Sequence, residues 1–298
     1  MTTYHELVDA NKARSGVVIA VFIAFITAAT YFICYALGFD YSAVGIALIL
    51  SGALSFASYY YSDQMILSLS GAIPANRRDH FDFYTVAENL SRPAGIPMPK
   101  LYVLEDSSPN AFATGRDPEH AVVCATTGLL KKLNRTELEG VIAHEMSHIK
   151  NYDTRLMSII TILIGLITLL SDILLRTNIR GKSDRDEDNS SSGIFMLVGF
   201  VLALLSPLIA QLIQLAVSRR REFLADASAA ALTKYPEGLA SALEKISQDK
   251  EPLEAANKAT AHLYIADPLR NRNSLIGWFD NLFNTHPPVQ ERIKALRS

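Results

Sequence analysis

Long apolar runs alternate with mixed polar stretches along the chain. Four runs approach or exceed the roughly 20 mostly apolar residues that a helix needs to cross a bilayer. They cover residues 16–37, 44–61, 156–175 and 194–217. Buried core helices are the alternative, but four such runs in one chain disfavour it, least so for the short run 44–61. The pattern therefore predicts a mainly α, polytopic membrane protein with four transmembrane helices.

The first and third runs each have a second interpretation. A signal-peptide core has about 7–15 apolar residues, whereas the first run is longer and is followed by another apolar run. We therefore interpret it as a span. Asp172 lies within a turn of the end of the third run, so we interpret it as an interfacial residue. A buried functional acid is the alternative there.

Four spans place both termini on one side of the membrane. Basic residues near the run ends favour the cytoplasm for that side. They are Lys12, Arg14, Arg77, Arg78, Lys150, Arg155, Arg219, Arg220 and Arg221, against none in residues 38–43. The loop 176–193 opposes this orientation, because it carries Arg176, Arg180, Lys182 and Arg185.

Outside these runs, the pattern predicts an α+β region with a small sheet. Short strands are expected at 100–104, 110–114 and 121–126, and helices at 79–90, from 134 onward, and at 222–234, 236–245 and 289–296. The predicted division is 1–61 (tail and first two spans), 62–155 (strands and one catalytic helix), 156–217 (last two spans with loop 176–193) and 218–298 (C-terminal catalytic region). Residues 184–192 are predicted to form a solvated linker, and the sequence of 255–274 predicts no secondary structure.

Composition excludes several classes of protein. The chain has 298 residues, of which 49% are hydrophobic and 19% charged, with two cysteines and a formal net charge of −2. A disordered chain would be poorer in apolar residues and richer in charge. Two isolated cysteines make no disulfide framework. A nucleic-acid-binding protein usually carries a basic excess, so no nucleic-acid partner is expected.

One predicted helix carries an H-E-x-x-H motif at His144, Glu145 and His148. Asn134 and Glu137 fit a capping box at the start of this helix. Residues four apart share one helix face, so both imidazoles can reach one ion. Zn²⁺ binds imidazole readily, and Glu145 can act as the general base. A chance match is the alternative, and the capped helix around the motif disfavours it.

A third ligand is expected from the E-x-x-x-D pair Glu222 and Asp226, which share one face of a later helix. Glu222 would bind the metal, and Asp226 would hold the far ring nitrogen of a ligand histidine. Solvated charges beside Arg219–Arg221 are the alternative. The third and fourth runs form a hairpin, however, which returns Glu222 to the side where His148 lies.

With these motifs in place, the chain resembles the HtpX-type membrane zinc metalloproteases, gluzincins related to the CAAX-prenyl endopeptidases. The resemblance covers nearly the whole chain. It rests on the four runs and on Pro109–Gly115, HEMSH followed by Asn151 and Asp153, Ser218–Glu222 with Ala225 and Asp226, and Thr285–Pro288 with Glu291 and Arg292.

The resemblance implies an activity and a setting. It implies one zinc ion per chain held by His144, His148 and Glu222, with Glu145 as base. It also implies an enzyme of the bacterial inner membrane that cuts misfolded or damaged membrane proteins from the cytoplasmic side, as protein quality control under stress. Its partners would be those substrates and the lipid bilayer.

Two further groups are candidate site residues. Asn110, Ala111, Phe112 and Ala113 would form an exposed strand edge that pairs with an extended substrate, unless they are an ordinary internal strand. His286 and Arg292 would stabilise the oxyanion of the reaction, since the pair recurs near the metal in the resembling family. The structural alternative is that His286 caps a turn and Arg292 pairs with Glu291 or Asp280.

Three other functions compete with this one. An intramembrane metalloprotease would bury H-E-x-x-H within a span, whereas polar residues flank it here. A scaffold with a structural zinc would need a fourth protein ligand, and no cysteine lies near the motif. A metal transporter would carry several ionisable groups in its spans, and only Asp172 qualifies.

Overall fold

The computed structural model describes residues 16–21, 41–162, 219–249, 251, 253, 263–265 and 287–298, together with single positions at 9, 13, 23, 24, 27 and 31. Within these ranges, no helix is both long enough and apolar enough to cross a bilayer. The predicted span 194–217 and most of 156–175 lie outside the described residues, as do loop 176–193 and most of 255–274. The predicted span 44–61 coincides with a helix, α2 (Tyr41–Tyr60).

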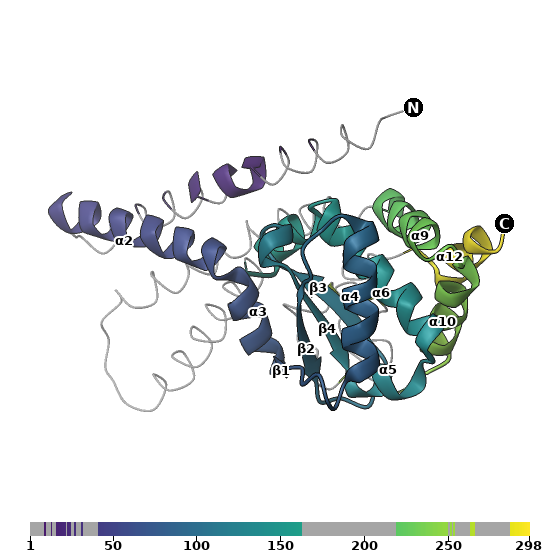
Figure 1. Cartoon of the computed structure of the whole chain (residues 1–298). Coiled ribbons are helices and arrows are strands. Elements are labelled where there is room, and N and C mark those ends of the chain that lie inside the picture. Colours follow the sequence, from purple (N-terminus) through teal and green to yellow (C-terminus); the bar gives the residue numbers. More distant parts are fainter. Residues whose placement is uncertain are drawn as a thin grey trace, which may run out of the picture.

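A four-stranded mixed sheet lies at the centre of the described region (Figure 1). Its strands are β1 (Ile73–Pro74), β2 (Lys100–Leu104), β3 (Ala111–Thr114) and β4 (Val122–Thr126), in the spatial order β1-β2-β4-β3. β2 and β4 run parallel, whereas β1 and β3 are antiparallel to their neighbours. The three predicted strands are confirmed to within a residue. β1, with two residues, is too short to give a period and was not predicted.

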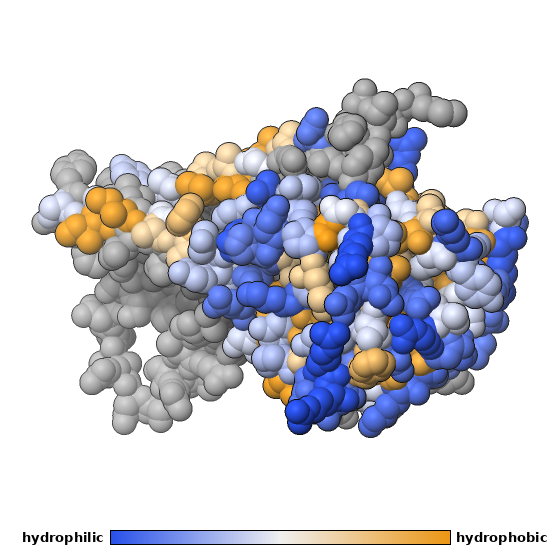
Figure 2. All heavy atoms as spheres, in the orientation of Figure 1, coloured by the Kyte–Doolittle hydropathy of each residue, from blue (hydrophilic) through white to orange (hydrophobic). Residues whose placement is uncertain are grey.

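Helices surround this sheet. They are α3 (Ser62–Ser70), α4 (Phe81–Ala94), α5 (Thr127–Lys132), α6 (Arg135–Lys150), α9 (Arg219–Thr233), α10 (Pro236–Gln248) and α12 (Val289–Leu296), with a short 3-10 turn at Pro118–His120. α2 projects away from this helix-and-sheet body (Figure 1), and apolar side chains gather along it in Figure 2. α3 and α5 were not predicted, because neither is long enough to show a helical period.

α6, which carries the H-E-x-x-H motif, begins as its sequence predicts. The Asn134 side chain accepts a hydrogen bond from the Glu137 N–H at 3.0 Å, and the Glu137 carboxylate accepts one from the Asn134 N–H at 2.9 Å. This reciprocal capping box satisfies two donors that a helix start otherwise leaves without partners. It fixes where the helix begins, and therefore which way its metal-binding face points.

α6 is the central helix of the fold, packed against β3, α4, α9 and α10. Its residues Val141, Ile142 and Met146 are fully buried in the main hydrophobic core. At Gly140 the backbones of α6 and α10 nearly touch, since a Cβ there would lie 2.6 Å from the Leu239 nitrogen. Any larger residue at Gly140 would therefore push α10 away from the motif-bearing helix.

The largest difference between a predicted and an observed helix boundary is at the end of α4, while the start of α9 and the end of α10 each differ by three residues. The helix expected to end near Leu90 runs through Pro93 to Ala94, and ends at Gly95 with φ 71°. Proline removes the bond that its N–H would have donated to the carbonyl four residues back, here Asn89, and this single loss close to the end does not stop the helix. The left-handed glycine, and not the proline, therefore ends α4.

Candidate metal centre

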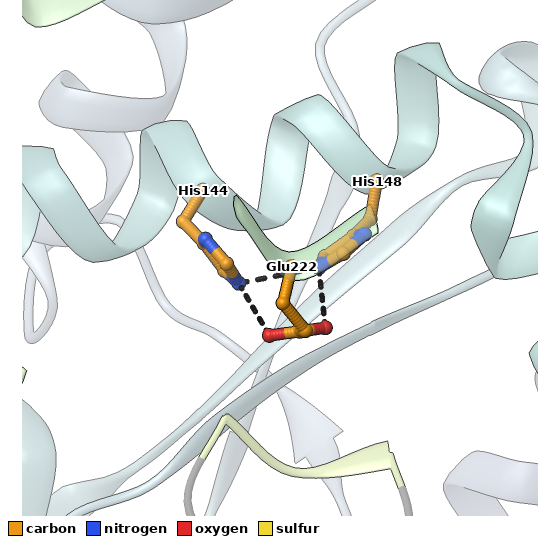
Figure 3. A group of neighbouring side chains, drawn as sticks. All are labelled: His144, His148 and Glu222. Atoms are coloured by element: carbon orange, nitrogen blue, oxygen red, sulfur yellow. Dashed lines mark hydrogen bonds and ion pairs between the residues drawn. The ribbon is translucent and has the colours of Figure 1, made fainter. Parts of the chain in front are cut away.

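Three side chains from two helices converge on one point. His144 and His148 project from the same face of α6, and Glu222 reaches them from α9 (Figure 3). The Glu222 carboxylate oxygens lie 3.7 Å from His144 Nε2 and 3.4 Å from His148 Nε2. Each residue offers a ligand atom within 4.8 Å of the others. The structure thus brings together the three residues predicted as metal ligands.

The two ring nitrogens facing each other fit a bound cation. His144 Nε2 and His148 Nε2 are 3.2 Å apart, and each Nδ1 lies within hydrogen-bonding distance of a carboxylate, at 2.9 and 3.0 Å. A neutral imidazole that donates from Nδ1 carries a lone pair on Nε2. Two lone pairs and a carboxylate aimed at one spot repel each other unless a positive charge lies between them. Nitrogen and oxygen donors of this kind suit zinc.

His144 is held from behind by Asp226 and Arg292. Its Nδ1 lies 2.9 Å from Asp226 Oδ1, and Arg292 donates to both oxygens of Asp226, from Nη2 at 2.7 Å and from Nε at 2.9 Å. Burial alone would raise the pKa of Asp226, but the hydrogen bonds from His144 and Arg292 lower it to about 2. Burial, together with the charge of Arg292, lowers the pKa of His144. Asp226 therefore stays ionised and His144 stays neutral, as a metal ligand must be.

His148 has a carboxylate behind it too. Its Nδ1 lies 3.0 Å from Asp153 Oδ2. Burial acts to lower the pKa of His148, but its hydrogen bonds with Asp153 and Glu222 outweigh burial and raise it well above the usual value. The surroundings of His148 thus favour a positive charge at this point. Asp153 was not among the predicted site residues.

Glu145 shares a small cavity with the three candidate ligands. Its side chain is buried, and the cavity has a volume of about 30 Å³, which is room for a water molecule. The rest of its lining is mixed, with the polar residues Asp153, Thr154 and Arg221 and the apolar residues Ala113, Met157, Leu263 and Ile265. This arrangement places a carboxylate, a candidate cation site and space for water within one pocket.

β3 lies at the edge of the sheet, as the substrate-binding prediction requires, with β4 as its only neighbouring strand among the described residues. The Asn110 carbonyl faces β4, where it accepts from the Thr126 N–H. By alternation, the backbone groups of Ala111 and Ala113 face the other way. The Ile265 N–H donates to the Ala111 carbonyl at 3.0 Å, so a short segment already covers that end of the edge. The structure places Ala113, at the other end, in the wall of the cavity.

The four residues predicted for this edge therefore differ in their surroundings. Phe112 is buried and meets the ring of Tyr264 edge-on, at 5.2 Å between centroids. Asn110 is buried at the end of β4. Of the four, only Ala113 lines the cavity that holds the candidate ligands.

The remaining predicted residues are Glu222, Asp226 and Arg292, which the structure describes, and His286, which it does not. Glu222 and Asp226 are 4% and 2% exposed, which excludes the alternative that they are solvated charges. Arg292 is fully buried beside them and pairs with Asp226 and not with Glu291, while Asp280, the other partner considered, lies outside the described residues. His286 lies outside the described residues, so its role stays a prediction.

Comparison with known proteins identifies the family of this chain. A sequence model of Peptidase family M48 matches residues 80–298. A protein named Protease HtpX homolog from Dictyoglomus turgidum is 46% identical over 299 residues, covering 99% of this chain and 94% of that protein. A protein of the same name from Thermoanaerobacter pseudethanolicus is 41% identical, covering 99% and 98%. Among solved structures, S. mikatae Ste24p aligns with a TM-score of 0.45 and 18% identity, over 97% of this chain and 66% of that one. On the family match and the full-length identity, this chain belongs to peptidase family M48 and is an HtpX-type metalloprotease.

Proposed function

We propose that this metalloprotease is a zinc endopeptidase of the bacterial inner membrane that removes misfolded or damaged membrane proteins. The observation that carries the proposal is the convergence of His144, His148 and Glu222 on one point beside Glu145. In this proposal the three residues hold one zinc ion per chain. Three protein ligands leave a position open for chemistry, whereas structural zinc sites usually have four. The triad therefore supports an enzyme over a scaffold with a structural zinc.

The proposed chemistry divides the work between the metal and the chain. Zinc, when bound, supplies the Lewis acidity that polarises the scissile carbonyl. Glu145 takes a proton from the attacking water and later hands it to the departing amine. Each Nδ1 lies against an aspartate, Asp226 for His144 and Asp153 for His148, which would fix both rings with Nε2 towards the metal.

Substrate binding is proposed at the edge of β3. An extended peptide that pairs with a sheet edge uses backbone hydrogen bonds and needs little side-chain recognition. The backbone groups of Ala113 point away from β4 and Ala113 lines the cavity, so a peptide paired there would run past Glu145. Ile265 covers the edge at Ala111 and would limit the pairing on that side. We therefore expect Ala113 to be the main backbone contact of the substrate.

The membrane setting is supported by α2 and by the apolar runs of the sequence. Ile46, Ile49 and Phe56 are 61%, 74% and 67% exposed on α2, and water would penalise so many exposed apolar groups. α6, by contrast, packs among the sheet and its helices, which disfavours an intramembrane H-E-x-x-H. In this proposal the two termini and the metal site face the cytoplasm.

Replacement of Glu145 by glutamine tests the mechanism. Glu145→Gln should keep zinc but lose turnover by about 10²–10⁴-fold, because a positioned base contributes that much. The measurements are metal content of the purified protein and cleavage of an unfolded protein substrate with and without a chelator. Glu139→Gln is the matched control, since Glu139 lies on the same helix, in a partly exposed ion pair with Arg135. A zinc-loaded Glu145→Gln protein with near-normal rates would remove Glu145 from the mechanism.

The quality-control role has a separate test. Membranes from cells that hold only Glu145→Gln should accumulate substrates that wild-type cells clear. Proteomic comparison of the two membranes after heat stress should identify membrane proteins with damaged or unassembled domains. Accumulation of soluble proteins alone would argue against the proposed substrate class while leaving the peptidase chemistry intact.

A further inference from the structure

Both imidazoles of the proposed metal site are backed by an aspartate, and each aspartate by a buried arginine. Behind His144 the partners are Asp226 and Arg292, as described above. Behind His148, Asp153 Oδ2 lies 3.0 Å from Nδ1, and Arg221 Nη1 lies 3.4 Å from the other oxygen of Asp153. The Asp153 and Arg221 side chains are only 4% and 9% exposed. The second histidine thus also has an aspartate and an arginine behind it, although Arg221 makes one contact of 3.4 Å where Arg292 makes two shorter ones.

The contact between His148 and Asp153 requires a break in the helix. In an unbroken α-helix, residues five apart point about 140° away from each other. α6 ends at Lys150, Tyr152 adopts a left-handed φ of 59°, and helical backbone resumes at Asp153. A tyrosine rarely adopts this conformation, and such outliers cluster at functional sites. Here the break turns the Asp153 carboxylate back towards His148.

Arg221 differs from the arginines beside it. Arg219 and Arg220 are exposed at the start of α9, whereas Arg221 is buried. A guanidinium is seldom buried without a charged partner. Its position also matters, because the next residue, Glu222, is the candidate third ligand. The first turn of α9 therefore supplies both Glu222, the candidate metal ligand, and Arg221, which contacts the Asp153 carboxylate behind His148.

We propose that Asp153 and Arg221 are positioning residues for the metal, with Asp153 fixing the His148 ring and Arg221 fixing Asp153. The inference rests on the proposed zinc site. Asp153 accepts the Nδ1 hydrogen of His148, which sets the tautomer and aims Nε2 at the metal. Arg221 holds that carboxylate in place and ties it to the helix that brings Glu222. Neither residue contacts the reacting atoms.

The test is the zinc affinity of the full-length protein in detergent, measured by competition with a chromophoric chelator. Asp153→Asn should weaken zinc binding by about 10–100-fold, as losses of such partners do. Arg221→Ala should weaken it by less, towards the lower end of that range. If Arg221 acts through Asp153, the double variant should match Asp153→Asn to within about twofold. Arg221→Lys keeps a charge and should recover part of the affinity.

The run of arginines offers its own control, because Arg220→Ala removes an exposed arginine of the same turn and should bind zinc as the wild type does. The absorption bands of the Co²⁺-loaded protein give a second measurement, which a merely structural ion pair would leave unchanged. We expect them to shift in Asp153→Asn but not in Arg220→Ala. Wild-type affinity and an unshifted Co²⁺ spectrum in Asp153→Asn would overturn the inference. A wild-type protein that binds no zinc would overturn the proposed function instead.

Discussion

At the scale of single residues, Arg292 is the most constrained cation of the site. Two of its nitrogens are committed to Asp226, and the third, Nη1, lies 3.5 Å from both a Glu222 oxygen and the Ile265 carbonyl. Burial alone would lower the pKa of Arg292, but the hydrogen bond to Asp226 and the nearby carboxylates raise it. These contacts support a positioning role more directly than the stabilisation of an oxyanion. The two roles predict different results.

We expect Arg292→Ala to lose zinc affinity and activity together. The substitution leaves the Asp226 carboxylate buried without its charged partner. Removing one partner of a buried ion pair lowers the free energy of unfolding by about 3–5 kcal/mol in comparable cases. Arg292→Lys should recover little, because lysine cannot bridge both carboxylate oxygens as the planar fork does. Zinc affinity and kcat are to be measured in parallel. A fall in kcat of about 10²–10³-fold with zinc affinity unchanged would instead favour oxyanion stabilisation.

At the scale of elements, the start of α6 is joined to α10 through Glu137. The carboxylate that completes the capping box also accepts from Ser241 Oγ at 2.7 Å and from Lys245 Nζ at 2.8 Å. Burial alone would raise the pKa of Glu137, but the hydrogen bonds from Lys245 and Ser241 hold it below the ordinary value of 4.5. The ionised form of Glu137 thus stabilises the contact between the two helices.

This contact predicts a dependence of stability on pH. Because the folded pKa lies below 4.5, the contribution of Glu137 is complete above pH 4.5 and is lost as the pH falls below it. Glu137→Gln should lower the free energy of unfolding by about 1–2 kcal/mol at pH 7 and flatten its decline below pH 4.5. Urea unfolding at several pH values is the measurement. Glu139→Gln, on the same helix, should change stability by less than about 0.5 kcal/mol and keep the wild-type pH dependence.

Tyr152 allows a test of the helix break itself. Asparagine visits the left-handed region readily, whereas a β-branched residue does not, at a difference of about 1–2 kcal/mol. Tyr152→Val should therefore be less stable than Tyr152→Asn by that amount and should bind zinc more weakly. Both variants lose the tyrosine ring near Arg155, so the comparison isolates the backbone. Equal unfolding midpoints would show that the break tolerates either residue.

The elements also show what the sequence could predict. Strand limits and the Asn134 cap were predictable, because their signals lie within a few residues. His144, His148 and Glu222 were predictable because the four-residue spacing of the histidines, together with a predicted hairpin of the last two runs, indicates where they meet. Asp153 was missed because its five-residue distance from His148 places it elsewhere on an unbroken helix. The left-handed Tyr152 that brings it back depends on packing, which gives no local signal.

At the scale of the whole molecule, the site is assembled from parts that lie far apart in the chain. α6 precedes residues 163–218 and α9 follows them, yet the two helices pack closely in the described structure. The two predicted spans lie between these helices. Because a hairpin of two spans returns to its starting side, both halves of the site should face the same compartment.

This orientation can be checked with introduced cysteines, after Cys34 and Cys124 are replaced. In intact cells, a membrane-impermeant thiol reagent should label a cysteine at position 191, in the loop between the last two predicted spans. It should spare a cysteine at Ser247 on α10, which the orientation places in the cytoplasm. Labelling after cell lysis verifies that both cysteines are reactive. The opposite pattern would place the metal site outside the cell without changing its chemistry.

If substrates pair with the edge of β3 as proposed, the position of this strand has a consequence for which proteins are cut. A peptide can pair there only if its own backbone is extended and has released its previous hydrogen bonds, so a natively folded segment must first open. When opening is fast relative to cleavage, the rate follows the open fraction of the substrate. A lesion that weakens a segment by about 1.4 kcal/mol should then raise its cleavage about tenfold, with no change in its sequence at the cut. The local stability of the substrate, rather than a recognition motif, would determine its lifetime.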